Sequence, residues 1–241
     1  MISVNNTFLG PNGKTKYWSK IKDTKEEGKF ITFYENGRKK SEGNKYNGIY
    51  EGITYNYYDN GKILSKNNFK NGSLYGEQIY FRMNGTIMTI ARCANSDDCY
   101  VKKYYETGKL MSEGTIKNGI EDDVWHYYNE NEQLIKIINY KEGMLDGWLI
   151  TFFPSGVTEF EIQFNNNEIK GIQNSYYENS KLKDNSVWAN NVRETISCYD
   201  KNKNLIECTE ENDRKVKEIL ANSKLRCKNK DNMFACLNVN D

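Results

Sequence analysis

Residues 52–63 read Gly-Ile-Thr-Tyr-Asn-Tyr-Tyr-Asp-Asn-Gly-Lys-Ile, and residues 69–76 read Phe-Lys-Asn-Gly-Ser-Leu-Tyr-Gly. Together they make one unit of a pattern that returns about every 24 residues along the chain. Self-similarity at such a period is typical of a repeat protein, in which each unit packs mainly on its neighbours. The repeat is therefore the feature from which the fold can be predicted.

Four columns of residues define the unit. The opening position is mostly glycine: Gly28, Gly52, Gly76, Cys99, Asp122, Gly147 and Gly171. An aromatic residue follows in every unit, and we call this the first aromatic column: Phe33, Tyr57, Phe81, Tyr104, Tyr127, Phe152 and Tyr176. The next position, the second aromatic column, is broken only by Arg82: Tyr34, Tyr58, Tyr105, Tyr128, Phe153 and Tyr177. A turn residue completes the pattern: Gly37, Gly61, Gly85, Gly108, Asn131, Gly156 and Ser180.

Each unit carries two turns, which we call the first turn, as at Asn36-Gly37, and the second turn, as at Asn47-Gly48. Asn-Gly between apolar stretches is a strong hairpin signal, because a type I′ turn needs positive φ at both central residues. The segments between turns, such as residues 148–153, are rich in aromatic and β-branched residues and predict strands. One repeat is therefore expected to be a β-hairpin.

The repeats predict an all-β fold, an elongated antiparallel meander of tandem hairpins. Large apolar groups point to both faces in residues 147–153, which favours a coiled sheet over a flat one with a single wet face. The unbroken first aromatic column suggests a continuous internal stack, in which Tyr57 would be buried. Both aromatic columns can instead be read as the sheet's own ladder or as a binding stripe.

The unit resembles the MORN-repeat variant family, on the residues quoted above. The resemblance covers residues 28–191 and extends weakly to Pro11-Asn12-Gly13-Lys14. It implies a scaffold of β-hairpins, and it implies a function only weakly, since one fold hosts many functions. Many bacterial members, the YwqK-like group, look like antitoxin or immunity proteins, and others are envelope proteins.

Three domains are expected: a degenerate N-terminal repeat or cap over residues 1–27, seven tandem repeats over 28–191, and a C-terminal cap over 192–241. The cap is predicted to contain a hairpin and one helix. Thr209 can cap the helix N-terminus, and Val216, Ile219 and Leu220 fall on one face. Such a helix would cover the last strand or be offered to a partner.

Composition excludes several classes of protein. The net charge is +1, with 34 basic and 33 acidic residues, which gives no bulk signal for nucleic-acid binding. Mean hydropathy is −0.85, and no apolar run approaches the roughly 20 residues of a membrane helix. Contact with a membrane surface stays open.

The six cysteines form three close pairs, which predict three disulfides: Cys93–Cys99, Cys198–Cys208 and Cys227–Cys236. The first two pairs lie symmetrically about expected turns, which would place their members opposite each other across two strands. Free thiols are an alternative, and a zinc site is disfavoured because the chain has no Cys-x-x-Cys and a single histidine. Disulfides imply an oxidising compartment.

An extracytoplasmic location, periplasmic or at the cell envelope, is therefore expected. The first residues, Met-Ile-Ser-Val-Asn-Asn, lack the basic start and apolar core of a signal peptide. We accordingly expect a leader to be missing from the sequence.

No catalytic constellation is found. His126 lies inside a repeat strand, where a substituted strand position is favoured over a general base. The sequence has no nucleophile elbow, phosphate loop or dinucleotide-binding motif. Asp97-Asp98 and residues 121–123 are acidic turns without the spacing of a calcium loop. Glu159 and Glu161 share a strand face but are weak support for a glycosidase. We expect no enzyme activity, no cofactor and no metal.

The surface favours a binding module. Tyrosine offers contact area at a low entropy cost, and Asn, Asp and Gly adapt their hydrogen bonds. The repeat departs most from its own pattern between residues 93 and 131, so one protein partner is expected there. The predicted contact residues are Tyr104, Tyr105, Glu121, Asp122, Asp123, Trp125, Tyr127 and Tyr128.

A toxin encoded nearby, presenting a basic cleft, would suit the acidic run. The sequence therefore predicts an immunity or antitoxin-like protein that occludes a toxin. The alternatives are simple decay of the repeat in this region and an envelope-associated structural protein that contacts lipid or cell wall.

Overall fold

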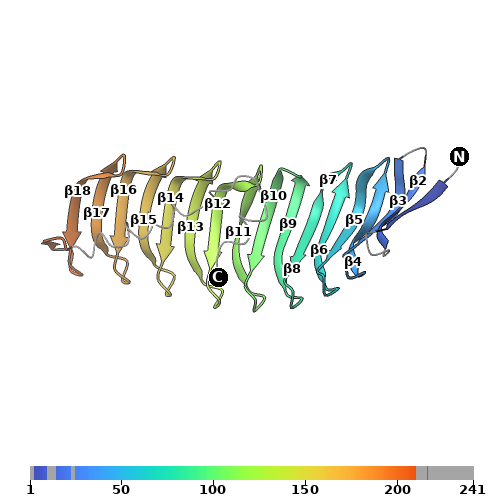
Figure 1. Ribbon diagram of the computed structural model, residues 1–241. Coiled ribbons are helices and arrows are strands. Elements are labelled where there is room, and N and C mark those ends of the chain that lie inside the picture. The colour runs from blue at the N-terminus through green and yellow to red at the C-terminus, as the bar shows by residue number, and fades with distance from the viewer. Residues whose placement is uncertain (1–2, 10–14, 23–24, 210–215, 217–241) are drawn as a thin grey trace. The chain divides into compact units, whose positions relative to one another are not determined.

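The computed structural model of the chain describes residues 3–9, 15–22, 25–209 and 216. The chain divides into two compact units, Met1–Leu110 and Met111–Asp241. Each unit is built from antiparallel strands that follow one another along the chain and lie side by side (Figure 1). The predicted boundaries at residues 27 and 191 stay predictions.

In unit 1, each strand pairs with the strand that precedes it, except that the two-residue β7 and then β8 both pair with β6. The strands are β1 Ser3–Leu9, β2 Thr15–Lys22, β3 Lys25–Phe33, β4 Lys39–Tyr46, β5 Ile49–Tyr57, β6 Ile63–Lys70, β7 Ser73–Leu74, β8 Gly76–Phe81, β9 Ile87–Asn95 and β10 Asp98–Tyr104.

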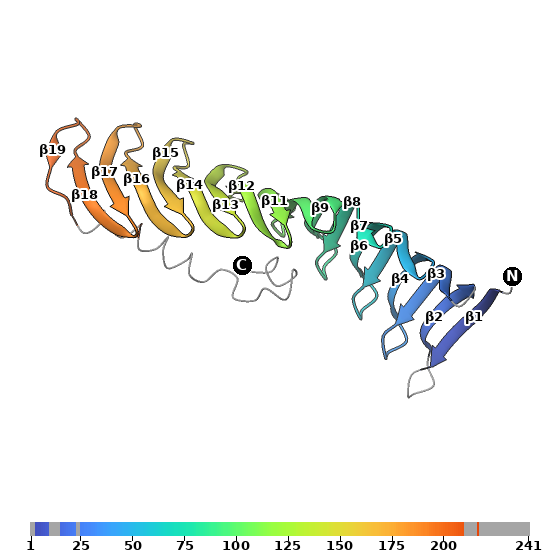
Figure 2. The same ribbon diagram turned by 90° about the horizontal axis from the view of Figure 1, so that it is seen from above.

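Unit 2 is likewise an antiparallel meander, and its strands curve along their length (Figure 2). The strands are β11 Leu110–Lys117, β12 Ile120–Tyr128, β13 Leu134–Lys141, β14 Met144–Phe152, β15 Thr158–Asn165, β16 Glu168–Tyr176, β17 Leu182–Ala189, β18 Val192–Tyr199 and β19 Leu205–Ile206. The all-β meander of hairpins is confirmed.

The predicted helix of the C-terminal cap is not supported. Apart from Val216, its residues lie outside those that the structure describes. Every element with defined bounds in the described part of the chain is a strand.

The two classes of turn differ in conformation. In the second turns both central residues are left-handed, with φ of 51° at Asn47 and 84° at Gly48, as a type I′ turn requires. In the first turns only the glycine is left-handed, with φ of 83° at Gly37, and Gly37 N donates to Tyr34 O at 2.9 Å. This is a three-residue loop with a bulge glycine, so type I′ was wrong for the first turns.

The repeat register also needs one correction. The last residue of β12 is Tyr128, so Tyr128 and not Tyr127 occupies the first aromatic column. The left-handed residues of this repeat are Asp123 and Glu132, each with φ of 63°, where Asp122 and Asn131 were predicted. Gly85 and Gly108 are 23 residues apart, but the 24-residue spacing resumes from Gly108 to Glu132, so only the positions of this one repeat were misassigned.

The core lies away from the first aromatic column. Residues of that column, Tyr57 among them, are half-buried, so the predicted internal stack is wrong. Apart from Val216, the buried apolar side chains described in unit 2 come from strand interiors: Trp125, Ile138, Tyr140, Leu145, Leu149, Phe160, Ile162, Phe164, Ile169 and Cys198. The core of unit 1 is more polar: Ser19, Phe30, Thr54, Ser65, Asn67, Gln78, Tyr80, Thr89, Ala91, Cys93, Cys99 and Val101.

Two of the predicted disulfides are confirmed. Cys93 and Cys99 are cross-strand partners in β9 and β10, with their Cα atoms 4.0 Å apart. Cys198 and Cys208 are bonded with a Cα separation of 5.4 Å, although the strand partner of Cys198 is Ile206. The third pair, Cys227 and Cys236, lies outside the described residues.

Candidate functional site

The predicted contact residues fall in both units. Tyr104 ends β10 and Tyr105 follows it in unit 1. The others lie on β12 in unit 2: Glu121, Asp122, Asp123, Trp125, Tyr127 and Tyr128. Tyr104 and Tyr105 are both half-buried.

Asp122 braces the neighbouring second turn. Its carboxylate accepts hydrogen bonds from Lys117 Nζ at 2.6 Å and from Glu142 N at 3.1 Å. These bonds, that from Lys117 first, hold the pKa of Asp122 below its usual value. The same brace recurs in other repeats, where the carboxylate of Glu51 accepts from Asn71 N at 2.8 Å. Asp122 therefore has a structural role, whereas the sequence predicted that it would contact a partner.

Trp125 is a core residue. It is 1% exposed, and its Nε1 donates to Thr115 O at 3.0 Å. Its ring covers Gly114, where a Cβ would lie 2.5 Å from two ring carbons. Trp125 is thus out of reach of a partner.

The tyrosines beside Trp125 on β12 are engaged within unit 2. Lys136 Nζ lies 4.6 Å from the ring centre of Tyr127. The hydroxyl of Tyr128 donates to Glu113 at 2.9 Å. Asp123, with its left-handed backbone, is the exposed acid of the predicted run, and Glu121 is half-buried.

Tyrosines of the first aromatic column donate their hydroxyls to carboxylates of the preceding strand. Tyr57 donates to Glu42 at 2.5 Å, and Tyr176 donates to Glu161 at 2.7 Å. Burial, and then the carboxylate, raise the pKa of each tyrosine to about 12. The hydrogen bond from Tyr57 lowers the pKa of Glu42. These hydrogen bonds join neighbouring strands, so the tyrosine hydroxyls already have partners within the sheet.

The second aromatic column joins consecutive repeats. The hydroxyl of Tyr58 donates to Phe81 O, one repeat further on, at 2.7 Å. Arg82 interrupts this column, as Asn129 does in the corrected register, and the Arg82 guanidinium donates in the same way, to Tyr104 O. Arg82 therefore provides the same kind of hydrogen-bond donor as the tyrosines of this column, although from a different side chain.

The described residues bring no catalytic or metal-binding group together. Glu161 accepts from Tyr176 and from Asn174 Nδ2, and Glu159 accepts from Thr151 at 3.1 Å. No group of three or more His, Cys, Asp or Glu in the described part is placed to hold a metal ion. A shallow cleft of about 420 Å³ is lined by Arg38, Lys39, Tyr57, Asn60 and Gly61. Its cations are already engaged, since Arg38 donates to Asp59 O and Lys39 pairs with Glu42.

The surface that sequence reasoning missed lies along the second turns of unit 1. We call it the tyrosine edge: Tyr46, Ile49, Tyr50, Tyr75 and Tyr100. Tyr46 is 61% exposed, Ile49 48% and Tyr75 46%. None of these residues lies in the two aromatic columns, so a search for repeating positions passes over them. The sequence signal that could have found this surface is a tyrosine that stands outside the two aromatic columns.

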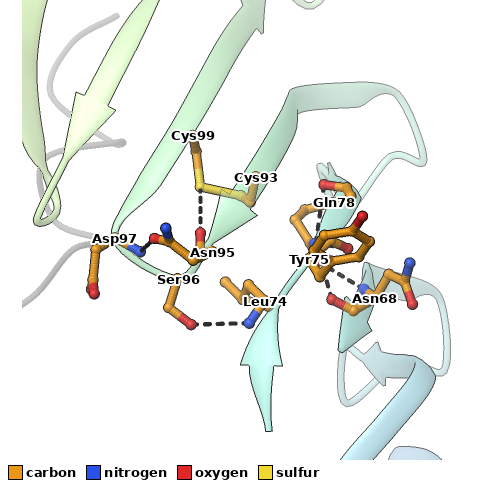
Figure 3. Close-up of a disulfide and its surroundings, with 10 residues drawn as sticks. Asn68, Leu74, Tyr75, Gln78, Cys93, Asn95, Ser96, Asp97 and Cys99 are labelled. Carbon is orange, nitrogen blue, oxygen red and sulfur yellow. Dashed lines mark hydrogen bonds between the residues drawn. A yellow bond between two sulfur atoms is a disulfide. The ribbon is translucent and has the colours of Figure 1, made fainter. Parts of the chain in front are cut away.

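Contacts join the consecutive second turns that carry the tyrosine edge. Ile49 packs on the next second turn, where a Cβ on Gly72 would lie 2.6 Å from its Cγ2. Gly72 N donates to Tyr50 O at 3.0 Å. Leu74 N, beside Tyr75, donates to Ser96 Oγ in the following turn at 2.9 Å (Figure 3). Lys70 Nζ lies 4.9 Å from the ring centre of Tyr75.

Unit 2 does not repeat this surface. The position of Tyr46 is held in unit 2 by Lys117, Lys141, Asn165 and Ala189, and that of Ile49 by Ile120, Met144, Glu168 and Val192. Where Tyr50 is partly exposed, Leu145 and Ile169 are buried, at 5% and 0%. The second turns of unit 2 therefore mostly keep apolar residues at the Ile49 position but have no aromatic residue at the position of Tyr46 or of Tyr50, and the exposed tyrosines are a property of unit 1.

Comparison with known proteins finds a family match over three of the repeats. The MORN repeat variant family matches residues 26–46, 50–71 and 100–118. No curated protein matches the sequence significantly. Among solved structures, a chain in the crystal structure of TcdB2-TccC3 aligns at 9% identity with a TM-score of 0.23. That alignment covers 82% of this chain and 13% of the other, and at this level it carries no argument. In the described residues no helix is long and apolar enough to cross a membrane.

Proposed function

We propose that this chain is a non-enzymatic repeat module that binds one protein partner. In the finer form of the proposal it is an immunity or antitoxin-like protein that occludes a toxin. It acts outside the cytoplasm, in the periplasm or at the cell envelope, and has no turnover of its own. Matches to the MORN repeat variant over three segments support a scaffold role, and the two disulfides support an oxidising compartment.

The tyrosine edge is the observation that carries the proposal. Solvent-exposed aromatic side chains side by side are costly to leave in water and are enriched at protein interfaces. Most of the same positions in unit 2 are polar or buried, so the repeat fold does not require these side chains to be exposed. A surface that the fold does not need is best explained by binding.

A co-purification experiment tests the proposal. The full chain is purified with the product of the adjacent gene, and affinity is measured for Tyr46→Ser with Ile49→Ser. We expect a loss of about tenfold or more, the range for truncating anchor residues at an interface. Asn165→Ser with Glu168→Ser, at the same repeat positions in unit 2, is the matched control. Equal affinities for both variants would reject the tyrosine edge as the site.

The original prediction of a site on β12 needs a sharper variant. Because Asp122 braces a turn, we would change only Glu121 and Asp123 to lysine. If the two lysine changes lower the affinity for the partner while Tyr46→Ser with Ile49→Ser does not, the partner binds at β12 and not at the tyrosine edge. Binding to anionic vesicles or cell wall, with no protein partner found, would favour the envelope alternative.

A further inference from the structure

The β9–β10 hairpin has an unusual second turn. In the other second turns that the structure describes, both central residues are left-handed, as at Asn71 and Gly72. Here the central residues are Ser96 and Asp97, and neither has positive φ. Left-handed pairs match the twist of the flanking strands, whereas other two-residue turns splay them. This turn therefore specifies its hairpin less well than the others do.

The core beneath the same hairpin is small and polar. Thr89 and Ala91 are buried in β9, where β15 has Phe160 and Ile162 at the same repeat positions. The Oγ1 of Thr89 has no hydrogen-bond partner among the described residues. Less apolar area buried means less stabilisation, and an unpaired buried hydroxyl adds a cost. Packing alone thus holds this repeat less firmly than the repeats of β12–β15.

The strand on the other side of β9 is interrupted. β7 ends at Leu74 and β8 begins at Gly76, and the buried amide of Gln78 fills the gap. Its Oε1 accepts from Asn68 N at 2.8 Å, and its Nε2 donates to Asn68 O and Tyr75 O, each at 3.1 Å (Figure 3). The Cys93–Cys99 disulfide lies next to the gap that Gln78 fills, because Cys93 is the strand partner of Gly76.

We propose that the Cys93–Cys99 disulfide is a redox-sensitive device. When oxidised, it stabilises the β9–β10 hairpin, which its turn and its small, polar core stabilise only weakly. A dithiol reductant attacks one sulfur, and a mixed disulfide forms. The second thiol of the reductant then displaces it, leaving two cysteine thiols and an oxidised, cyclic reductant. Both sulfurs belong to buried residues, and Cys99 is the more exposed at 9%. Once reduced, the β8–β10 segment opens locally while the repeats of β12–β15 stay folded.

This device regulates the tyrosine edge, because Tyr75 precedes β8 and Tyr100 lies on β10. That consequence rests on the proposed function, whereas the opening itself does not. A partner bound through the tyrosine edge would be released under reducing conditions, which fits a protein that works only in an oxidising compartment.

Hydrogen exchange of the full chain tests the opening. Exchange is followed by mass spectrometry with and without dithiothreitol, and alkylation confirms which thiols are free. We expect protection over residues 76–104 to fall about tenfold or more on reduction, and protection over 134–165 to change less than about twofold. The variant C93A with C99A should reproduce the loss without reductant. C198A with C208A, which removes the other disulfide, is the matched control and should leave residues 76–104 protected.

Two results would overturn the device. One is unchanged protection over residues 76–104 with both thiols alkylated. The other is loss of protection throughout the chain, which would make the disulfide a global staple. Partner binding is measured separately. If the segment opens and the partner stays bound, the device stands and the tyrosine edge fails as the binding site.

Discussion

Gly114 and Trp125 offer a test of how the core is packed. Gly114 is not left-handed, so alanine would normally stabilise this position by about 0.4–1 kcal/mol through the unfolded state. Here the new Cβ would lie 2.5 Å from Cγ and Cε2 of Trp125, a ring that is buried and held by its bond to Thr115 O. Overpacking of this kind costs about 1–3 kcal/mol. We therefore expect Gly114→Ala to lower the free energy of unfolding in urea.

The neighbouring repeat supplies the compensating variant. At the same positions it has Ile138 opposite Leu149, a large residue where this repeat has glycine and a smaller one where it has tryptophan. Trp125→Leu alone leaves a cavity and should cost about 2–4 kcal/mol. The free energy of unfolding of the double variant Gly114→Ile, Trp125→Leu should exceed, by about 1–3 kcal/mol, the value expected if the effects of Gly114→Ile and Trp125→Leu simply added. A neutral Gly114→Ala, or strictly additive effects, would refute the packing argument.

Three further outcomes follow from the hydrogen bonds. Tyr57→Phe removes the bond to Glu42 and should cost about 1 kcal/mol in urea. Because the folded pKa of Tyr57 is raised to about 12, its contribution is present below about pH 10 and is lost towards pH 12, so the wild type should lose its advantage over Tyr57→Phe across that interval. The folded pKa of Asp122 is lowered, so its contribution is present above about pH 4 and is lost on further acidification, and melts of Asp122→Asn should converge with wild type at low pH. Arg82→Ala removes the bond to Tyr104 O and should destabilise unit 1 by about 1 kcal/mol, measured as urea midpoints.

The parts of the fold that sequence predicted are those where residue type dictates conformation. Asn47-Gly48 forms a type I′ turn because both residues tolerate positive φ. Symmetry about the turn predicted Cys93–Cys99, but these two residues face each other because a β-bulge shifts the register between Asp98 and Cys99. The first turns differed because their loop contains one more residue, and then only Gly37 needs the left-handed region.

The errors share a different cause. Near Tyr127-Tyr128 several residues could fill the aromatic columns, and the true register depends on left-handed Asp123 and Glu132. Glutamate has little preference for that conformation, and Asp122 and Asp123 tolerate it equally, so the sequence does not show which residue is left-handed. The core was misplaced because aromatic rings with polar ends, such as Tyr57, suit half-buried positions beside a carboxylate.

Tyr75 shows most directly where function replaces structure. The residue before the opening position is a turn brace in other repeats, where Glu51 accepts from Asn71 N and Asp146 accepts from Asn166 N. Tyr75 stands at that position and has no carboxylate to offer. The turn is held instead by Leu74 N donating to Ser96 Oγ and by the disulfide beside it. A repeat that gives up its brace and exposes a ring in its place departs from the local rule without a structural gain, and such departures are expected at functional sites.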